Sequence, residues 1–136
     1  RSWELEKFIE VAEAIDGSVA ISGRKKRRQI QQFPRYKITP TLNDMVGAIA
    51  EAKMIICNDS GPLHLASILG VPAIIVSAII PPDFLLKHYP KAKAITPINS
   101  PCSPCHRDYT HCLGKPCVEL TRIDSSRVIE AVRNAL

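Results

Sequence analysis

The chain has 136 residues, of which 46% are hydrophobic and 23% charged, the composition of a globular domain able to bury one core. Its 18 Lys and Arg residues exceed its 13 Asp and Glu residues by five, and one run, Arg24 to Arg28, holds five of the cations. Because the other charges balance, the composition argues against a histone-like protein that spreads positive charge over one face. The longest nearly uncharged stretch, 71–82, is too short and too rich in proline to cross a bilayer.

The first half of the chain alternates between helical and strand patterns. Apolar residues recur at helical spacing over 3–15 and again over 42–52. Short apolar runs at 18–22 and 54–57 are typical of buried strands, and a further short strand is expected at 36–39. This half is therefore predicted to contain two helices, each followed by a buried strand.

The second half continues the alternation. Gly70 suits the end of one helix, and Asp124 suits the N-cap of the last one. Helices that alternate with short, fully apolar strands predict an α/β fold whose open parallel sheet is covered on both faces. Such sheets bind ligands outside the carboxyl ends of their strands. In chain order we expect a helix at 62–69, a strand at 73–77, a loop from 81, a strand at 93–97 and a helix at 125–135.

The most informative stretch is Asn58 to His64, Asn-Asp-Ser-Gly-Pro-Leu-His, which lies between an expected strand and an expected helix. Asp59 or Ser60 can cap this helix, and Gly61 lets a ligand approach the backbone. Pro62 at the first helical position gives up only an N–H that the helix does not use. The open N–H groups and the positive end of the helix then favour a phosphate or a pyrophosphate.

Two side chains of this stretch are placed to contact such a ligand. His64 falls on the first helical turn and can reach the same group. Asp59 is an anion beside an anion site, so we expect it to accept hydrogen bonds from sugar hydroxyl groups. The alternative interpretation is a capped helix with nothing bound, because Asp-Ser-Gly-Pro is common turn chemistry and a single histidine is often just a satisfied polar residue.

Residues 58–72, Asn-Asp-Ser-Gly-Pro-Leu-His-Leu-Ala-Ser-Ile-Leu-Gly-Val-Pro, resemble the signature of glycosyltransferase family 9, the ADP-heptose:lipopolysaccharide heptosyltransferases. Arg1-Ser-Trp3 with the amphipathic helix after it is similar to the start of the C-terminal half in that family. The helix over 42–52, the motif Cys-Ser-Pro-Cys105 and the closing helix also agree in order. The resemblance implies a Rossmann-like three-layer domain with a parallel sheet, the C-terminal half of a GT-B fold.

The resemblance also implies roles for residues of the signature. Ser60 and Gly61 would hold the donor diphosphate at the helix N-terminus, and Asp59 and His64 would lie by the donor sugar and phosphate. A cation and a helix terminus near a departing nucleoside diphosphate stabilise its charge in the transition state. The full set of implied donor-binding residues is Arg1, Pro40, Asp59, Ser60, Gly61 and His64.

Two of these residues lie outside the signature. The resemblance implies that Arg1 neutralises the diphosphate and that Pro40 borders the nucleoside. The implied reaction is transfer of heptose from an ADP-sugar to the lipopolysaccharide inner core, with no metal or other cofactor required. The acceptor half, and the general base within it, would precede residue 1, so residues 1–136 are expected to form a single nucleotide-sugar-binding domain that binds the donor without turnover.

The resemblance also implies partners and a location for the chain. Its partners would be the ADP-sugar and, through the missing half, a lipid-linked saccharide acceptor; nucleic acid is not expected. Charges occur from the first residue, unlike in a secretory signal. We therefore expect a bacterial protein in the cytoplasm, with peripheral contact to the anionic inner membrane.

The sequence departs from the family pattern in two places. In the family, a carboxylate that binds the ribose usually follows the strand equivalent to 19–22. In this chain, Arg24 to Arg28 follow that strand instead. At the end of the strand expected at 73–77, where the family usually has Gly-Pro-Thr, this chain has Ser77-Ala-Ile-Ile-Pro81. Both departures concern the donor, so its identity stays open at this stage.

A cysteine-rich loop at 102–117 has three interpretations. Its spacing, C-x₂-C-x₆-C-x₄-C, could hold a tetrahedral structural zinc. Disulfides are the second option, disfavoured in a reducing compartment, and thiols packed against the sheet are the third. Cys57, at the end of a strand, is expected to be a small buried hydrophobe. The four candidate ligands are Cys102, Cys105, Cys112 and Cys117.

The basic run also leaves alternatives open. Arg24 to Arg28 could contact nucleic acid, anionic lipid head groups or donor phosphates, or form a solvated helix face. A second hypothesis for the whole chain follows from this run. It is a zinc-stapled binding module that contacts nucleic acid or an anionic membrane through these cations.

Overall fold

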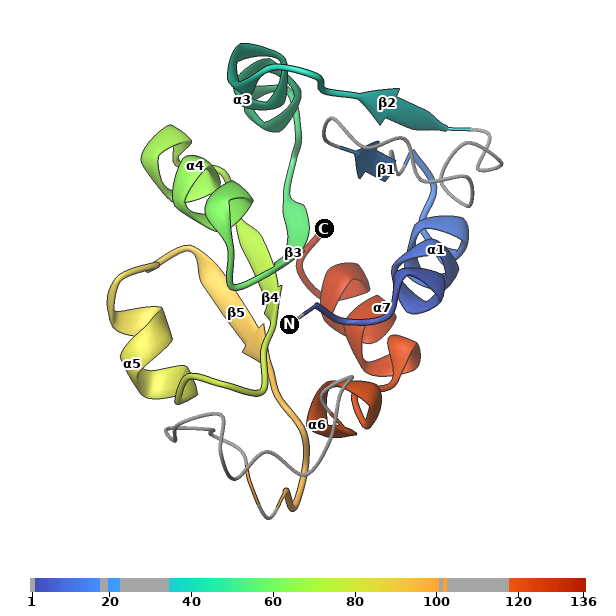
Figure 1. Cartoon of the computed structure of the whole chain (residues 1–136), viewed down its shortest axis with the longest axis vertical. Coiled ribbons are helices and arrows are strands. Elements are labelled where there is room, and N and C mark those ends of the chain that lie inside the picture. Colours follow the sequence, from blue (N-terminus) through green and yellow to red (C-terminus); the bar gives the residue numbers. More distant parts are fainter. Residues whose placement is uncertain (1, 18–19, 23–34, 101, 103–117) are drawn as a thin grey trace.

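The computed structural model describes residues 2–17, 20–22, 35–100, 102 and 118–136 (Figure 1). The helices are α1 (Leu5–Ala14), α3 (Leu42–Ala50), α4 (Gly61–Leu69), α5 (Pro82–Lys87), α6 (Val118–Thr121) and α7 (Ser125–Arg133). The strands are β1 (Ala20–Ser22), β2 (Tyr36–Ile38), β3 (Ile55–Asn58), β4 (Ala73–Val76) and β5 (Ala92–Ile95). No helix in these ranges is long and apolar enough to cross a membrane.

The strands pair in parallel, as the alternation of helices and strands predicts. β1 pairs with β2, and a second sheet has the order β3-β4-β5. The described strands of the two sheets do not pair with each other, and β3 is an edge strand of the second sheet. The carboxyl end of β3 lies at the edge of the sheet where all three parallel strands end, and open parallel sheets bind ligands outside these ends.

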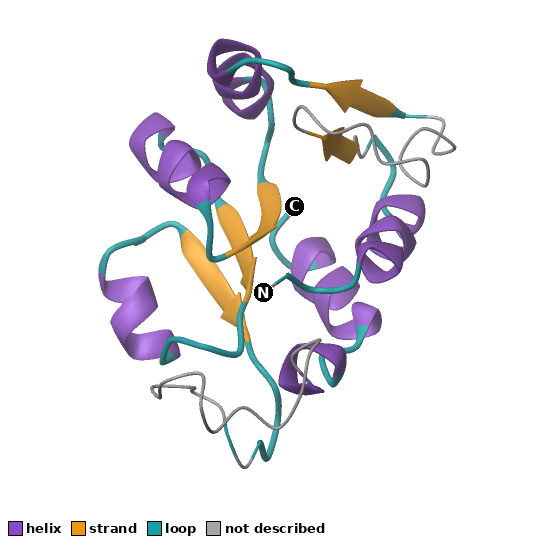
Figure 2. Cartoon of the chain, viewed as in Figure 1, coloured by secondary structure: helices purple, strands orange, loops and turns teal. Residues whose placement is uncertain are grey.

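Helices cover both faces of the sheet β3-β4-β5 (Figure 2). Successive side chains of a strand point to opposite faces. In β4, Ile74 and Val76 accordingly pack with α1, α6 and α7, whereas Ala73 and Ile75 pack with α3, α4 and α5. All four residues are buried, so a continuous apolar strand is the sequence that this position requires. The expected α/β fold with three layers is confirmed.

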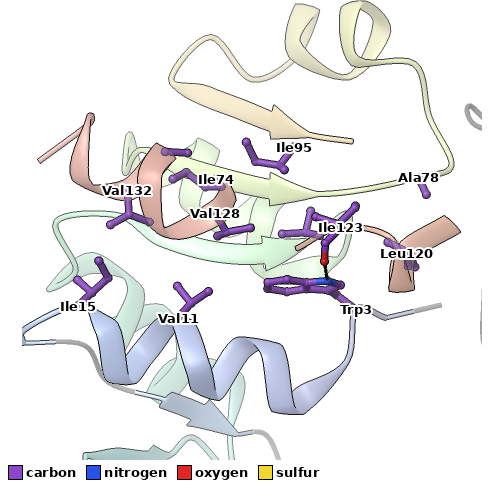
Figure 3. Packing of buried hydrophobic residues seen from close by; sticks show 12 residues of the cluster. Trp3, Val11, Ile15, Ile74, Ala78, Ile95, Leu120, Ile123, Val128 and Val132 are labelled. Carbon is purple, nitrogen blue, oxygen red and sulfur yellow. Dashed lines mark hydrogen bonds between the residues drawn. The ribbon is translucent and has the colours of Figure 1, made fainter. Parts of the chain in front are cut away.

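Trp3 anchors the layer formed by α1, α6 and α7 (Figure 3). The side chain is 1% exposed and meets the ring of Phe8 edge to face at 4.9 Å. Its indole N–H donates to the carbonyl oxygen of Ile123 at 3.0 Å, and Lys7 Nζ donates to the same oxygen at 3.0 Å. The start of the chain is thereby fixed to the loop that precedes α7.

Several expected helix ends are confirmed. Thr41 accepts from the backbone N–H of Asp44 at 3.1 Å, and the carboxylate of Asp44 accepts from the N–H of Thr41 at 3.0 Å, a capping box at the start of α3. Gly70 ends α4 in the left-handed conformation, with φ 70°. Asp124 caps α7 by accepting from the N–H of Ser126 at 3.1 Å.

Other boundaries differ from the expectation. α1 begins at Leu5 rather than at residue 3, because Trp3 precedes the helix and packs across the core instead. The loop expected from residue 81 contains α5, which begins at Pro82 because the fixed φ of proline suits the first helical position. Strand and helix ends elsewhere shift by one or two residues, and α6 was not expected.

Replacement of Trp3 by phenylalanine is expected to destabilise the domain. The Trp3→Phe substitution leaves a cavity and removes the indole donor to Ile123, so the free energy of unfolding should fall by about 1–3 kcal/mol. Urea unfolding followed by circular dichroism measures the change. Phe84→Ala, at an aromatic residue that is 60% exposed, is the control and should change the value by about 0.5 kcal/mol or less.

The cap of α7 should contribute a pH-dependent part of the stability. The N–H of Ser126 donates to the carboxylate of Asp124 and lowers the pKa of this residue, so the contribution is complete above the unfolded value of about 4 and is lost as pH falls through the folded value. Asp124→Asn should therefore lower the urea midpoint at pH 7 and should lower it less at pH 3. Glu130→Gln, an exposed substitution on the same helix, should not show this pattern.

Candidate functional site

Asn58 joins three segments at the carboxyl end of β3. Its side-chain oxygen accepts from the backbone N–H of Trp3 at 3.2 Å, and its side-chain nitrogen donates to the carbonyl oxygen of Val76 at 2.8 Å. The amide therefore holds residues 2–4 beside the carboxyl ends of β3 and β4. Arg1, the cation expected in the site, lies outside the described residues.

The turn from β3 to α4 is built differently from the sequence-based expectation. Ser60 occupies the N-cap position in an extended conformation, but its side chain does not cap the helix. The hydroxyl group donates instead to the carbonyl oxygen of Asn58 at 3.1 Å. Asp59 does not cap the helix either, and Pro62 is the second helical residue rather than the first. The predicted side-chain cap is therefore wrong.

Fewer N–H groups are open at the start of α4 than the sequence suggested. Pro62 has no N–H, and the N–H of Leu63 donates to the carbonyl oxygen of Ser60 at 2.9 Å. Of the first three helical residues, Gly61 alone keeps an N–H with no acceptor within this turn. The N–H of Gly61 and the positive end of the helix dipole thus remain available to an anion.

Gly61 lies on an open part of the surface. A Cβ atom built at this residue meets no heavy atom within 4 Å, and the residue is exposed. A ligand can therefore come close to the backbone at the start of α4. The space, rather than a left-handed conformation, is what the glycine provides here.

His64 meets a residue that the sequence analysis did not identify. Its Nδ1 atom lies 2.7 Å from the hydroxyl oxygen of Tyr89, and the two ring centroids are 5.8 Å apart. Burial, and then the negative charge of Asp59, raise the pKa of Tyr89, so its hydroxyl stays protonated at neutral pH. Tyr89 follows α5, 25 residues after His64, and no local spacing connects the two.

Cys57 behaves as the sequence predicts. Its side chain is buried in the layer formed by α3, α4 and α5. Burial, with a smaller contribution from the charge of Asp59, raises its pKa to about 12. The thiol is therefore protonated at neutral pH and is not a nucleophile or a thiolate ligand.

The structure brings together four of the six expected site residues. Asp59, Ser60, Gly61 and His64 share the turn and the first helical turn after β3, with Asp59 half-buried and the other three exposed. Pro40 is exposed and follows the carboxyl end of β2, in the other sheet. The position of Pro40 relative to a bound nucleoside therefore stays a prediction.

The cysteine and arginine clusters fall mainly outside the described part of the chain. Of the four candidate zinc ligands only Cys102 is described, and it is half-buried. The described ranges contain no group of three or more side chains able to hold a metal. Cys105, Cys112, Cys117 and the run Arg24 to Arg28 lie outside these ranges, so zinc binding and the role of the run stay predictions.

Loss of the Asn58 amide should destabilise the site and the fold together. Asn58→Ala removes the acceptor of Trp3 and leaves the carbonyl oxygen of Val76 without this donor, so a loss of about 1–3 kcal/mol is expected. Asn43→Ala, at an exposed position of α3, is the control and should change stability by about 0.5 kcal/mol or less. Equal midpoints for the two variants in urea would contradict the role given to Asn58.

Comparison with known families identifies the family and agrees with the fold. The family model described as glycosyltransferase family 9 (heptosyltransferase) matches residues 2–115, a range that includes the whole turn between β3 and α4. Neither a curated protein nor a solved structure gives a significant match. The family match covers most of the chain and agrees with a Rossmann-like parallel sheet of the GT-B kind. The chain therefore belongs to glycosyltransferase family 9, whose members transfer glycosyl groups.

Proposed function

We propose that the turn at 59–64 binds the diphosphate of an ADP-sugar, from which heptose is transferred to the lipopolysaccharide inner core. The observation that carries the proposal is the position of this turn between the carboxyl end of β3 and the start of α4, at the edge where parallel sheets bind ligands. The N–H of Gly61 and the α4 dipole supply the attraction for phosphate. Membership of a heptosyltransferase family supports the choice of sugar.

Asp59 contributes hydroxyl recognition rather than phosphate binding. Its carboxylate lies near enough to Cys57 and Tyr89 for its charge to raise the pKa of both. A negative charge so close to the helix terminus repels a phosphate placed directly against it. Hydroxyl groups of the ribose or of the donor sugar can donate to the carboxylate, and such charge-assisted hydrogen bonds orient the sugar next to the diphosphate.

Two further residues complete the proposed donor site. Arg1 neutralises the diphosphate, and the support for this is the bond from Trp3 to Asn58, which holds the residue two positions downstream at the carboxyl ends of β3 and β4. Pro40 borders the nucleoside from the end of β2. Helix terminus and cation together stabilise the leaving nucleoside diphosphate, so the transfer step needs no metal.

The acceptor is bound by a second half of the enzyme in this proposal. The acceptor is a lipid-linked saccharide, and the general base that deprotonates its hydroxyl group belongs to that half. In the described residues, Cys57 is protonated and does not abstract a proton, and this proposal assigns Asp59 and His64 to the donor. The chain by itself is thus a donor-binding unit that works at the cytoplasmic face of the inner membrane.

Removal of the Asp59 charge should weaken donor binding. Asp59→Asn should raise the Kd for ADP-heptose about tenfold or more, because a hydrogen bond to a charged group contributes about 1.5–3 kcal/mol. Isothermal titration calorimetry measures the change. Asp83→Asn, an exposed carboxylate in the first turn of α5, is the matched control and should bind like the unmodified chain. Failure of the unmodified chain to bind ADP or ADP-heptose would refute the proposed function.

A methyl group at the start of α4 should separate ligand binding from stability. Gly61→Ala has room in the unliganded chain, so its melting temperature should stay within a few degrees of the unmodified value, whereas affinity for ADP should fall if phosphate approaches the backbone there. Gly47→Ala, an exposed helical glycine with equal room, is the control and should retain ADP affinity. Equal ADP affinity in both variants would place the phosphate elsewhere.

A further inference from the structure

We propose that Tyr89 is a positioning residue that holds His64 with the Nε2–H group directed to the donor phosphate. This inference rests on the proposed function, because it assigns a specific atom of the donor site. The two side chains come from different elements, His64 from the first turn of α4 and Tyr89 from the connection between α5 and β5. The contact of 2.7 Å between Nδ1 and the hydroxyl oxygen is the observation that carries it.

The proposal assigns one of two possible forms to the imidazole ring, because Nδ1 can accept from the phenol or donate to it at this distance. Burial and the nearby charge of Asp59 raise the pKa of Tyr89, so the phenol keeps its proton, and in the proposed arrangement it donates to Nδ1 of His64. A neutral histidine that accepts at Nδ1 carries its own proton at Nε2. His64 is exposed, so that N–H is available to a phosphate or sugar oxygen at the start of α4.

The backbone around Tyr89 is fixed. The N–H of Tyr89 donates to the carbonyl oxygen of Leu86 at 3.1 Å, and its own carbonyl oxygen accepts from Ala92 at 2.9 Å. Pro90 occupies the second position of this four-residue turn, where proline is favoured. Lys91 Nζ donates to the carbonyl oxygen of Gly70 at 3.0 Å, at the other end of α4.

The turn at 89–92 therefore forms hydrogen bonds to α4 at two places. It bonds to the helix end through Lys91 and to the first helical turn through Tyr89. An exposed histidine on a helix otherwise exchanges between rotamers, and ordering it on binding costs free energy. A hydroxyl group held by this hydrogen-bonded turn lowers that cost before the ligand arrives.

His88 offers an internal comparison within the same region. It is exposed, as His64 is, and its ring meets Phe84 edge to face with centroids 5.5 Å apart. This contact orients the ring without a hydroxyl group. Loss of the Tyr89 hydroxyl should accordingly change the ring signals of His64 and leave those of His88 unchanged.

A double-mutant cycle tests whether Tyr89 acts through His64. Tyr89→Phe keeps the ring and removes the hydroxyl, and it should raise the Kd for ADP about fivefold to tenfold, as should His64→Gln. The double variant should bind ADP no more weakly than His64→Gln alone. Losses that multiply in the double variant would show independent effects and overturn the positioning role. Thermal melts of all four proteins establish that each variant is folded.

Nuclear magnetic resonance supplies a readout that does not need ADP. Long-range ¹H–¹⁵N spectra at pH 8 should show His64 with its proton on Nε2 and a hydrogen-bonded Nδ1, and Tyr89→Phe should shift the Nδ1 signal of His64 alone. If the His64 signal is unchanged in Tyr89→Phe while the unmodified chain binds ADP, this inference is overturned and the proposed function stands. Absence of ADP binding with the predicted signals present would instead refute the proposed function, and the positioning role with it.

Discussion

The hydrogen bonds of the Asn58 side chain tie the site to the fold. This one amide joins the segment that leads into α1, the end of β3 and the end of β4, so the layer that contains α1 is tied to the sheet at its carboxyl edge. Trp3 extends the same connection into the core beneath α7. The turn that follows Asn58 therefore starts from a fixed point, and a ligand bound there does not have to order it.

Burial of β4 on both faces supports placing the proposed site next to β3. A strand whose four side chains all lie in the core leaves no polar group for a ligand. β3 is covered less completely, since Ile56 and Asn58 are only half-buried, and it is an edge strand of its sheet. Packing and topology thus leave the carboxyl end of β3 as the place where a polar side chain can serve both fold and ligand.

The sequence was sufficient for those features that depend on neighbouring residues. The 3.6-residue pattern predicted α3, the apolar run predicted β4, and Gly70 and Asp124 marked helix ends. It was insufficient where a side chain has more than one local hydrogen-bond partner and where a contact bridges distant segments. The hydroxyl of Ser60 turned to a carbonyl oxygen instead of the helix, and Tyr89 reached His64 from another element, and neither has a local pattern that reveals it. Pro81 and Pro82 suggested a loop because a six-residue helix is too short for periodicity to appear.

The charge arrangement explains why a phenol suits the position beside His64. A carboxylate there would favour the charged imidazolium, and it would also add a second negative charge near Asp59 at a site meant for a diphosphate. Tyr89 fixes the ring through a hydrogen bond while staying neutral, because its raised pKa keeps the proton on the hydroxyl. The proposed site then contains one anion, Asp59, assigned to sugar hydroxyls, and hydrogen-bond donors at Gly61 and His64 assigned to phosphate. Any net attraction for the donor must consequently come from the helix dipole and from cations brought to the carboxyl edge of the sheet, which is the role proposed for Arg1.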